Sequence, residues 1–274
     1  MANIDPKVVN DFGSEWTRFD QQDVSELELR AIFDAYFSVF PWQDLPIDCA
    51  GADIGCGSGR WARFAAPQVG HLHCVEPSSA LSVAQRALQG HENISFHDAD
   101  IDHLPFEDDS LDFFYSLGVL HHVPDTELAL KQCVRKLKPG GLALVYLYYR
   151  FDNRPWWFQR VWQASEVGRR AISKMPTSTK NRVTDVIAAS VYYPLARAAL
   201  VAEQFGADVD NIPLSSYRDR SFYMMRTDAL DRFGTRLEQQ FTRDEILQMM
   251  KRCGLRDIKF SDSAPFWCAV GTKA

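Results

Sequence analysis

Residues 53–60 of this chain read Asp53-Ile54-Gly55-Cys56-Gly57-Ser58-Gly59-Arg60. A short apolar run precedes this stretch and a helical pattern follows it, so we expect it to join a β-strand to an α-helix. Glycine has no Cβ, and three alternating glycines therefore let backbone N–H groups and the start of the helix approach a ligand closely. The stretch predicts a ligand-binding turn in an α/β fold.

A second acidic residue indicates a nucleoside ligand. Glu76 lies 23 positions after Asp53, at the end of the next apolar run, where its carboxylate can bond a ribose diol. Dinucleotide loops carry G-x-G-x-x-G, but the sixth position counted from Gly55 is Arg60. Asp53 also places negative charge beside the loop, which suits a cationic amino group better than a diphosphate. A dinucleotide is therefore the weaker interpretation.

Apolar runs alternate with helical patterns over residues 48–149, which is typical of βαβ units and a parallel sheet. The expected strands are Cys49–Ile54, His71–Val75, Ile94–His97, Leu111–Ser116 and Leu142–Tyr149. The expected helices are Arg60–Ala66, one from Ser78 to just before Gly90, and Thr126–Leu137 with Asp125 as its N-cap. Lys138-Pro139-Gly140-Gly141 is expected to form the turn before the fifth strand.

The C-terminal segment predicts one more helix and two strands. Thr242 and Glu245 form a capping box that opens a helix ending near Arg252. Leu255–Ser261 and Phe266–Thr272 predict two strands joined by a link that is too short for a parallel crossover, so they should be antiparallel. The expected fold class is α/β: a Rossmann-like, seven-stranded, mostly parallel sheet with an antiparallel last strand, plus a helical lid or insertion.

Five segments in order carry a resemblance to a known family. The glycine loop resembles motif I of the class I methyltransferases that use S-adenosylmethionine (SAM), particularly the small-molecule, methyltransferase type 11-like branch. The other four segments that resemble family motifs are Val75–Ser78, His97–Phe106, Leu111–His122 and Leu137–Gly141. The resemblance implies SAM as cofactor, a small-molecule acceptor and transferase activity.

The pattern of predicted elements divides the chain, and the resemblance implies a set of cofactor contacts. We expect an N-terminal helical lid over residues 1–47, a SAM-binding core over 48–149, a helical insertion that caps the acceptor over 150–240, and the final helix and strands over 241–274. The residues expected to bind the cofactor are Asp53, Gly55, Cys56, Gly57, Glu76, Pro77, Asp98, Ala99, Ser116, Leu117 and Trp16. Trp16 either covers the sulfonium through a cation–π contact or forms a helical core pair with Phe12.

Histidines provide the candidate catalytic groups. His121 or His122 is a possible general base because imidazole titrates near neutral pH, and only one of two adjacent helical residues is expected to face the site. Packing or a cofactor contact is the alternative role. His71 and His73 share one face of a strand, but no further ligand has suitable spacing, so we expect no metal.

The insertion holds the candidate acceptor contacts. Its arginines suit a carboxylate or phosphate and its aromatic rings suit a sugar, which favours an acidic or sugar-type metabolite. The residues expected to bind the acceptor are Tyr149, Arg150, Tyr217, Arg218, Arg220 and Tyr223. The alternative is that they build a helical cap or a contact within a homodimer.

Composition narrows the partners. The formal charge of −6 and the dispersed lysines and arginines argue against nucleic acid. Six scattered cysteines and an N-terminus without an apolar segment favour a cytoplasmic location. Val186–Ala202 is interrupted by Pro194 and Arg197, so we expect helices packed on a core and no membrane partner. An NAD-dependent oxidoreductase and a non-enzymatic binding module remain the alternative functions.

Overall fold

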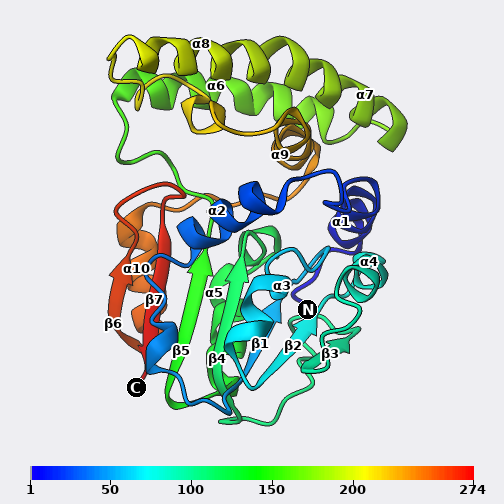
Figure 1. The fold of residues 1–274 in the computed structure, drawn as a ribbon, viewed down its shortest axis with the longest axis vertical. Coiled ribbons are helices and arrows are strands. Elements are labelled where there is room, and N and C mark those ends of the chain that lie inside the picture. The colour runs from blue at the N-terminus through cyan, green and yellow to red at the C-terminus, as the bar shows by residue number, and fades with distance from the viewer. Residues whose placement is uncertain (1) are drawn as a thin grey trace. The chain divides into compact units, whose positions relative to one another are not determined.

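A seven-stranded sheet organises the chain in the computed structural model, which describes residues 2–274. The strand order is β3-β2-β1-β4-β5-β7-β6, and Figure 1 shows the strands side by side in this order. The strands are β1 (Ala50–Ile54), β2 (His71–Val75), β3 (Ile94–His97), β4 (Leu111–Leu117), β5 (Leu137–Tyr146), β6 (Leu255–Phe260) and β7 (Cys268–Lys273). β7 is antiparallel to both of its neighbours, β5 and β6, and the other neighbouring pairs are parallel, so the predicted fold class is confirmed.

The chain divides into two compact units. Unit 1 contains the residues up to Gln21, Leu29–Tyr149 and Leu237–Ala274. Its helices are α1 (Pro6–Arg18), most of α2 (Glu26–Tyr36), α3 (Ala62–Ala65), α4 (Ala80–Ala87), α5 (Thr126–Lys136) and α10 (Arg243–Arg252). Unit 2 contains Gln22–Glu28 and Arg150–Arg236. The functions predicted for residues 1–47 and 150–240 stay predictions.

The central strands are buried along their length because helices cover the sheet. β4 carries Phe113, Phe114 and Tyr115, none of which has any exposed surface. Gly51 on β1 pairs with Phe113, and a Cβ at Gly51 would overlap the Phe113 ring. Close packing of a glycine against a large ring thus sets the spacing of β1 and β4.

Several predicted boundaries differ from the structure. The expected turn at residues 138–141 belongs to β5, because a register shift between Leu111 and Phe113 lets β5 begin its pairing with β4 at Leu137. β5 ends at Tyr146 rather than Tyr149. The helix after the glycine loop is short and continues as a 3-10 turn at Ala66–Gln68, where Pro67 cannot donate a helical hydrogen bond.

The helix caps predicted from the sequence are confirmed. Asp125 caps α5 by accepting from the Leu128 N–H at 2.9 Å. Thr242 and Glu245 form the reciprocal capping box that was expected at the start of α10. Local hydrogen bonding of these side chains therefore determines where both helices begin.

Unit 2 is helical. It contains α6 (Trp156–Ile172), α7 (Thr177–Ile187), α8 (Tyr193–Gln204) and α9 (Phe222–Gly234). A small core joins α8, α9 and the π-helical turn Ala188–Tyr192, and its buried members are Ala188, Tyr192, Ala196, Met225 and Ala229. The π turn precedes Pro194 and accommodates the ring, so α7 and α8 form one helix over Thr177–Gln204.

The sequence predicts separate helices packed on a core here, whereas the structure has one continuous helix of which only one face packs on the core. By length and composition it is long and apolar enough to cross a membrane. Only 22% of its most apolar 18-residue stretch is buried inside the structure. Val186 and Val201 are 63% and 51% exposed. One face of the helix packs within unit 2 and the other presents apolar side chains outward.

Replacing Gly51 by Ala should lower the free energy of unfolding by about 1–3 kcal/mol, because the added methyl group overpacks the contact with Phe113. Gly168→Ala is the matched control, since a Cβ at this position in α6 meets nothing within 4 Å. The control should stabilise by about 0.5–1 kcal/mol through helix propensity. Urea unfolding followed by circular dichroism measures both values, and equal effects would contradict the packing argument.

Candidate functional site

The glycine loop forms a left-handed backbone turn after β1. Gly55, Gly57 and Gly59 have φ angles of 80°, 54° and 78°, which side chains with a Cβ rarely adopt. Space is also limited, because a Cβ at Gly55 would lie 2.5 Å from Val119 and one at Gly57 would lie 2.9 Å from the indole nitrogen of Trp16. The glycines are therefore required by backbone geometry and by close neighbours.

Glu76 holds the loop from the end of β2. One carboxylate oxygen accepts from the Gly57 N–H at 3.1 Å and the other accepts from the Ser78 N–H at 3.1 Å. The residue is 7% exposed, and burial raises the pKa of its carboxyl group, while these hydrogen bonds lower it in part. Each carboxylate oxygen keeps a further lone pair with which it can accept from a ligand hydroxyl.

Asp53 lies beneath the loop with 2% of its surface exposed. Burial raises the pKa of Asp53 to about 8, although a hydrogen bond from the Tyr115 hydroxyl at 2.9 Å opposes the shift. The Glu76 carboxylate raises this pKa further and Arg60 lowers it. A cation bound next to Asp53 would favour its ionised form.

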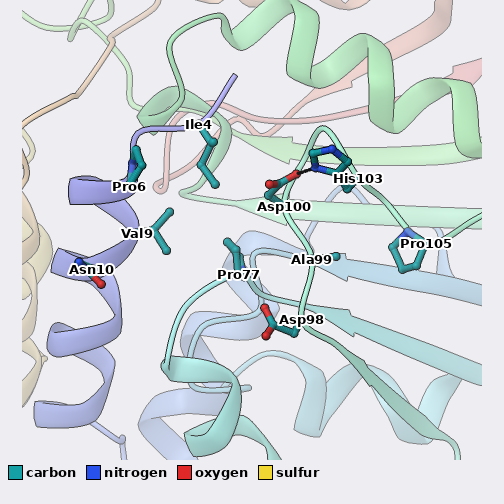
Figure 2. A pocket seen from close by; sticks show the side chains of 10 residues that line it. All are labelled: Ile4, Pro6, Val9, Asn10, Pro77, Asp98, Ala99, Asp100, His103 and Pro105. Atoms are coloured by element: carbon teal, nitrogen blue, oxygen red, sulfur yellow. Dashed lines mark hydrogen bonds and ion pairs between the residues drawn. The ribbon is translucent and has the colours of Figure 1, made fainter. Parts of the chain in front are cut away.

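A pocket of about 580 Å³ lies between the start of the chain and the ends of β2 and β3. Its volume lies within the range of small-molecule sites. The pocket is lined by Ile4, Pro6, Val9, Asn10, Pro77, Asp98, Ala99, Asp100, His103 and Pro105. Figure 2 shows Pro77, Asp98 and Ala99 on one side of it and α1 on the other.

Asp98 fits the adenine contact that the family resemblance implies. Its side chain is exposed and makes no hydrogen bond or ion pair within residues 2–274, so its oxygens can accept from an amino group. Asp100, two residues later, is instead bonded to His103 at 2.8 Å. The pocket and its acceptor therefore suit a nucleoside base, and Glu76 suits the adjoining ribose.

Comparisons with known proteins identify the domain that carries this loop. Residues 52–145 match the family model described as a methyltransferase domain. The chain contains a class I SAM-dependent methyltransferase domain. A phosphoethanolamine N-methyltransferase of Caenorhabditis elegans is 35% identical over 100 residues, which are 35% of this chain and 23% of that protein. A demethylmenaquinone methyltransferase of Staphylococcus aureus is 34% identical over 96 residues, which are 34% of this chain and 40% of that protein.

The fold likeness extends over nearly the whole chain. A structure of a SAM-dependent methyltransferase from Thermotoga maritima matches with a TM-score of 0.51 at 18% identity, covering 98% of this chain and 99% of that one. At this identity the match shows a similar fold and nothing about the activity. The chain spans less than half the length of the two curated relatives named above.

The structure brings Trp16 to the glycine loop of the methyltransferase domain. Trp16 lies on α1 against Gly57, and the Arg60 guanidinium lies 4.7 Å from its ring centroid. Phe12, one turn earlier, contacts the ring of His122 at 4.8 Å. Both aromatic residues of α1 therefore face the carboxyl ends of the central strands.

Three predicted cofactor residues differ in which of their atoms a cofactor could contact. The Cys56 thiol hydrogen bonds to Cys74, which raises its pKa well above the usual range, and burial raises it further. Ser116 is fully buried and its hydroxyl donates to the Ile54 carbonyl at 2.9 Å. These two side chains are committed to the core, so only their backbone is available to a cofactor. Leu117 ends β4 with 8% of its surface exposed.

His121 and His122 lie on a 3-10 turn, Leu120–His122, and both are buried. Their ring centroids are 4.0 Å apart, and the His121 ring lies 4.0 Å from that of Tyr148. Burial lowers the pKa of His121 well below its usual value, so the ring is neutral, and neither ring nitrogen has a hydrogen-bond partner. His122 contacts the Leu237 carbonyl through Nδ1 at 2.7 Å.

The predicted acceptor residues divide between the two units. Tyr149 belongs to unit 1, where it contacts Phe266, and the other five belong to unit 2. The Arg218 guanidinium donates to Glu203 at 2.8 Å, which raises the pKa of Arg218, whereas the Arg220 side chain makes no ion pair within the described chain. Tyr217 packs against Tyr192.

Sequence reasoning did not predict that Phe12 contacts His122, that Tyr115 contacts Asp53 or that Tyr148 contacts His121. Tyr115 and Tyr148 lie in apolar or aromatic runs, so nothing in the sequence separates them from core residues. His71 and His73 contact Ser95 and His97, respectively. No group of three or more side chains that could hold a metal occurs in residues 2–274.

Asp53 should make SAM binding depend on pH. Because its pKa is about 8 without a cation, pairing with the SAM ammonium group requires release of a proton, and affinity should rise by up to tenfold per pH unit, a rough upper limit, from about pH 5.5 to 7.5. Asp53→Asn should flatten this dependence and weaken binding. Calorimetric titration at several pH values measures it.

The same group should make the stability of the folded protein fall as pH rises, whereas SAM affinity rises. The folded protein keeps a proton on Asp53 that the unfolded chain releases above its pKa of 3.8, so this group destabilises the fold increasingly as pH rises toward 8. Asp53→Asn should therefore unfold at an equal or higher temperature than the wild type at neutral pH. Asp262→Asn, at an exposed link, is the control and should change neither property.

Proposed function

We propose that this chain transfers the methyl group of SAM to a small-molecule acceptor. The observation that carries the proposal is the arrangement of Glu76 and Asp98. Glu76 is bonded to the glycine loop, and Asp98 lines the adjoining pocket without a protein partner. This arrangement supports binding of an adenosine whose ribose and base contact successive strand ends.

SAM supplies an activated methyl group whose transfer proceeds by in-line displacement. The protein's contribution is to align the acceptor with the methyl group and to exclude water. Trp16 and Phe12 cover the strand ends from α1, and Asp53 and Glu76 supply negative charge beneath the loop once a bound cation favours their ionised forms. An aromatic ring and buried carboxylates together favour a cationic ligand over a diphosphate.

Removing either acid should weaken SAM binding. Glu76→Ala should raise the Kd by about tenfold or more, because it removes a buried, hydrogen-bonded carboxylate. Asp98→Ala should raise it by a few fold, about the value of one exposed hydrogen bond. Glu92→Ala is the control, since Glu92 is an exposed acid beside β3. Titration with NAD in parallel tests the oxidoreductase alternative, and selective NAD binding would overturn the proposal.

We infer that His121 is the best candidate for a proton acceptor. It is neutral, fully buried, and its two ring nitrogens lack partners, which is costly unless a ligand or water satisfies them. It lies just beyond β4, at the same edge of the sheet as the glycine loop. A general base is required for a hydroxyl acceptor but not for an amine that arrives neutral.

His121→Phe separates catalysis from packing, because a phenyl ring can replace imidazole against His122 and Tyr148. If His121 is the base, kcat should fall by about a hundredfold or more while the Kd for SAM stays within about threefold. The assay follows S-adenosylhomocysteine release with the acceptor found in a metabolite screen. An unchanged kcat and pH profile would leave His121 a packing residue.

An acidic or sugar-type metabolite is the proposed acceptor class. Arg220 is the most available of the predicted cationic contacts, since Arg218 already pairs with Glu203. Arg220→Ala should raise the acceptor KM at least severalfold, and Arg218→Ala should do so less strongly. If neither variant changes KM, these arginines do not bind the acceptor.

A further inference from the structure

The outward face of α6 carries an unusual combination of side chains. Trp156 is 76% exposed, Val167 is 74% exposed, Val161 is 53% exposed and Trp157 is 40% exposed. Helical spacing places Trp156, Arg160, Val167 and Arg170 on one face, because their separations are four, seven and three residues. Large apolar groups and cations therefore alternate along a single exposed stripe.

The inward face of α6 already has its partners within unit 2. Arg169 is buried and bonds to Glu166 and to the Thr235 carbonyl at 2.8 and 2.9 Å. Arg232 of α9 also pairs with Glu166 and lies over the Trp162 ring at 3.7 Å. The exposed stripe is thus not needed to hold the helix in place, and its apolar surface has another role.

The charge of this surface is one-sided. From Trp156 to Ala202 no Asp or Glu is exposed, whereas the exposed cations are Arg160, Arg170, Lys174 and Arg182; the exposed acids Asp152 and Glu203 lie just outside this stretch. None of these four side chains forms an ion pair with another described residue. The chain as a whole carries a formal charge of −6, so a local cationic surface is a departure from its composition.

We propose that the α6 face docks reversibly onto a lipid bilayer that contains anionic headgroups. Exposed tryptophan prefers the boundary between headgroups and acyl chains, valine enters the apolar side, and arginine and lysine contact lipid phosphates. The continuous α7–α8 helix adds apolar surface in unit 2, because Val186 and Val201 on the helix and Phe205 just after its end are exposed.

Contact along the surface fits better than a membrane span. α6 contains Arg160, Glu166, Arg169 and Arg170, which a bilayer core would not accept. The α7–α8 helix is held by an Asp185–Arg226 ion pair and by Arg197, which donates to carbonyls of the loop before α9. A helix with apolar and cationic groups on one face, anchored on the other, lies flat in an interface.

A second copy of this chain is a poorer occupant. In a twofold dimer the same patch faces itself, so Arg160, Arg170 and Lys174 would approach their own counterparts, and no exposed acid between residues 156 and 202 would pair with them. Nucleic acid would match the charge but not the exposed valines. An anionic bilayer satisfies both the charge and the apolar surface.

Vesicle co-sedimentation of the full chain tests the proposal. The probes are vesicles of phosphatidylcholine alone and with about 30% phosphatidylglycerol. The wild type should bind the anionic vesicles about tenfold or more tightly than the neutral ones, and about 0.5 M NaCl should remove most of this difference. No binding to either vesicle would overturn the proposal.

Two sets of variants distinguish apolar from charged contacts. Apolar contacts are removed by the pair Trp156→Ser and Val167→Ser, with Leu27→Ser and Ile47→Ser as the control pair, which are 85% and 97% exposed elsewhere. Charged contacts are removed by the triple change Arg160→Gln, Arg170→Gln and Lys174→Gln, with Lys7→Gln, Lys131→Gln and Lys251→Gln as a control of equal charge.

Both test sets should weaken binding by about tenfold or more, and both controls should leave it unchanged. Thermal unfolding and SAM binding check that each variant is folded, and these two readouts do not depend on vesicles. If the test and control variants lose vesicle binding equally, the protein adsorbs without using the α6 face, and the proposal is wrong. A stable wild-type dimer that only the test sets dissociate would assign the face to a second copy instead.

Discussion

The hydrogen bond from the Gly57 N–H to the Glu76 carboxylate is the contact on which the site depends. It joins the loop after β1 to the end of β2, two segments whose strands pair in register from Ala50 with His71 to Ile54 with Val75. The loop can turn toward Glu76 only because Gly57 adopts a positive φ. One carboxylate thus satisfies a buried amide and remains able to accept from a ribose.

The glycine loop also lies close to two buried acids whose ionised forms lack a full set of cationic partners. Asp53 and Glu76 are both buried near the loop, and each has a raised pKa because burial disfavours its charged form. The nearest cation, Arg60, lies over the rings of Trp16 and Trp61 at 4.7 and 4.3 Å. When these acids ionise, their negative charge is therefore incompletely compensated by the protein. A cationic ligand relieves this imbalance, whereas a diphosphate would increase it, so the charge of the loop distinguishes the two kinds of cofactor.

The sequence was most informative where backbone geometry restricts the choice of residue. The glycine loop, the Asp125 cap and the Thr242 capping box each require particular side chains, and each was predictable. The start of β5 was not, because residues 138–141 of β5 fall between its pairings with Leu111 and Phe113 of β4, and this shift depends on contacts across the sheet. The placement of Phe12 against His122 was equally hidden, since the sequence of α1 does not reveal which distant ring it meets.

The difference between the two units has a physical origin. In unit 1 the glycine loop and the buried acids restrict the sequence, and residues 52–145 match the methyltransferase domain. Unit 2 must satisfy only amphipathic packing of helices around a small core, and many sequences do so equally well. Its distinctive residues are therefore those that packing does not explain: the unpaired Arg220, the exposed Trp156 and the cations of α6. Side chains that the fold does not need are the ones whose identity reports on what a surface contacts, which is why both of our proposals for unit 2 are tested at these residues.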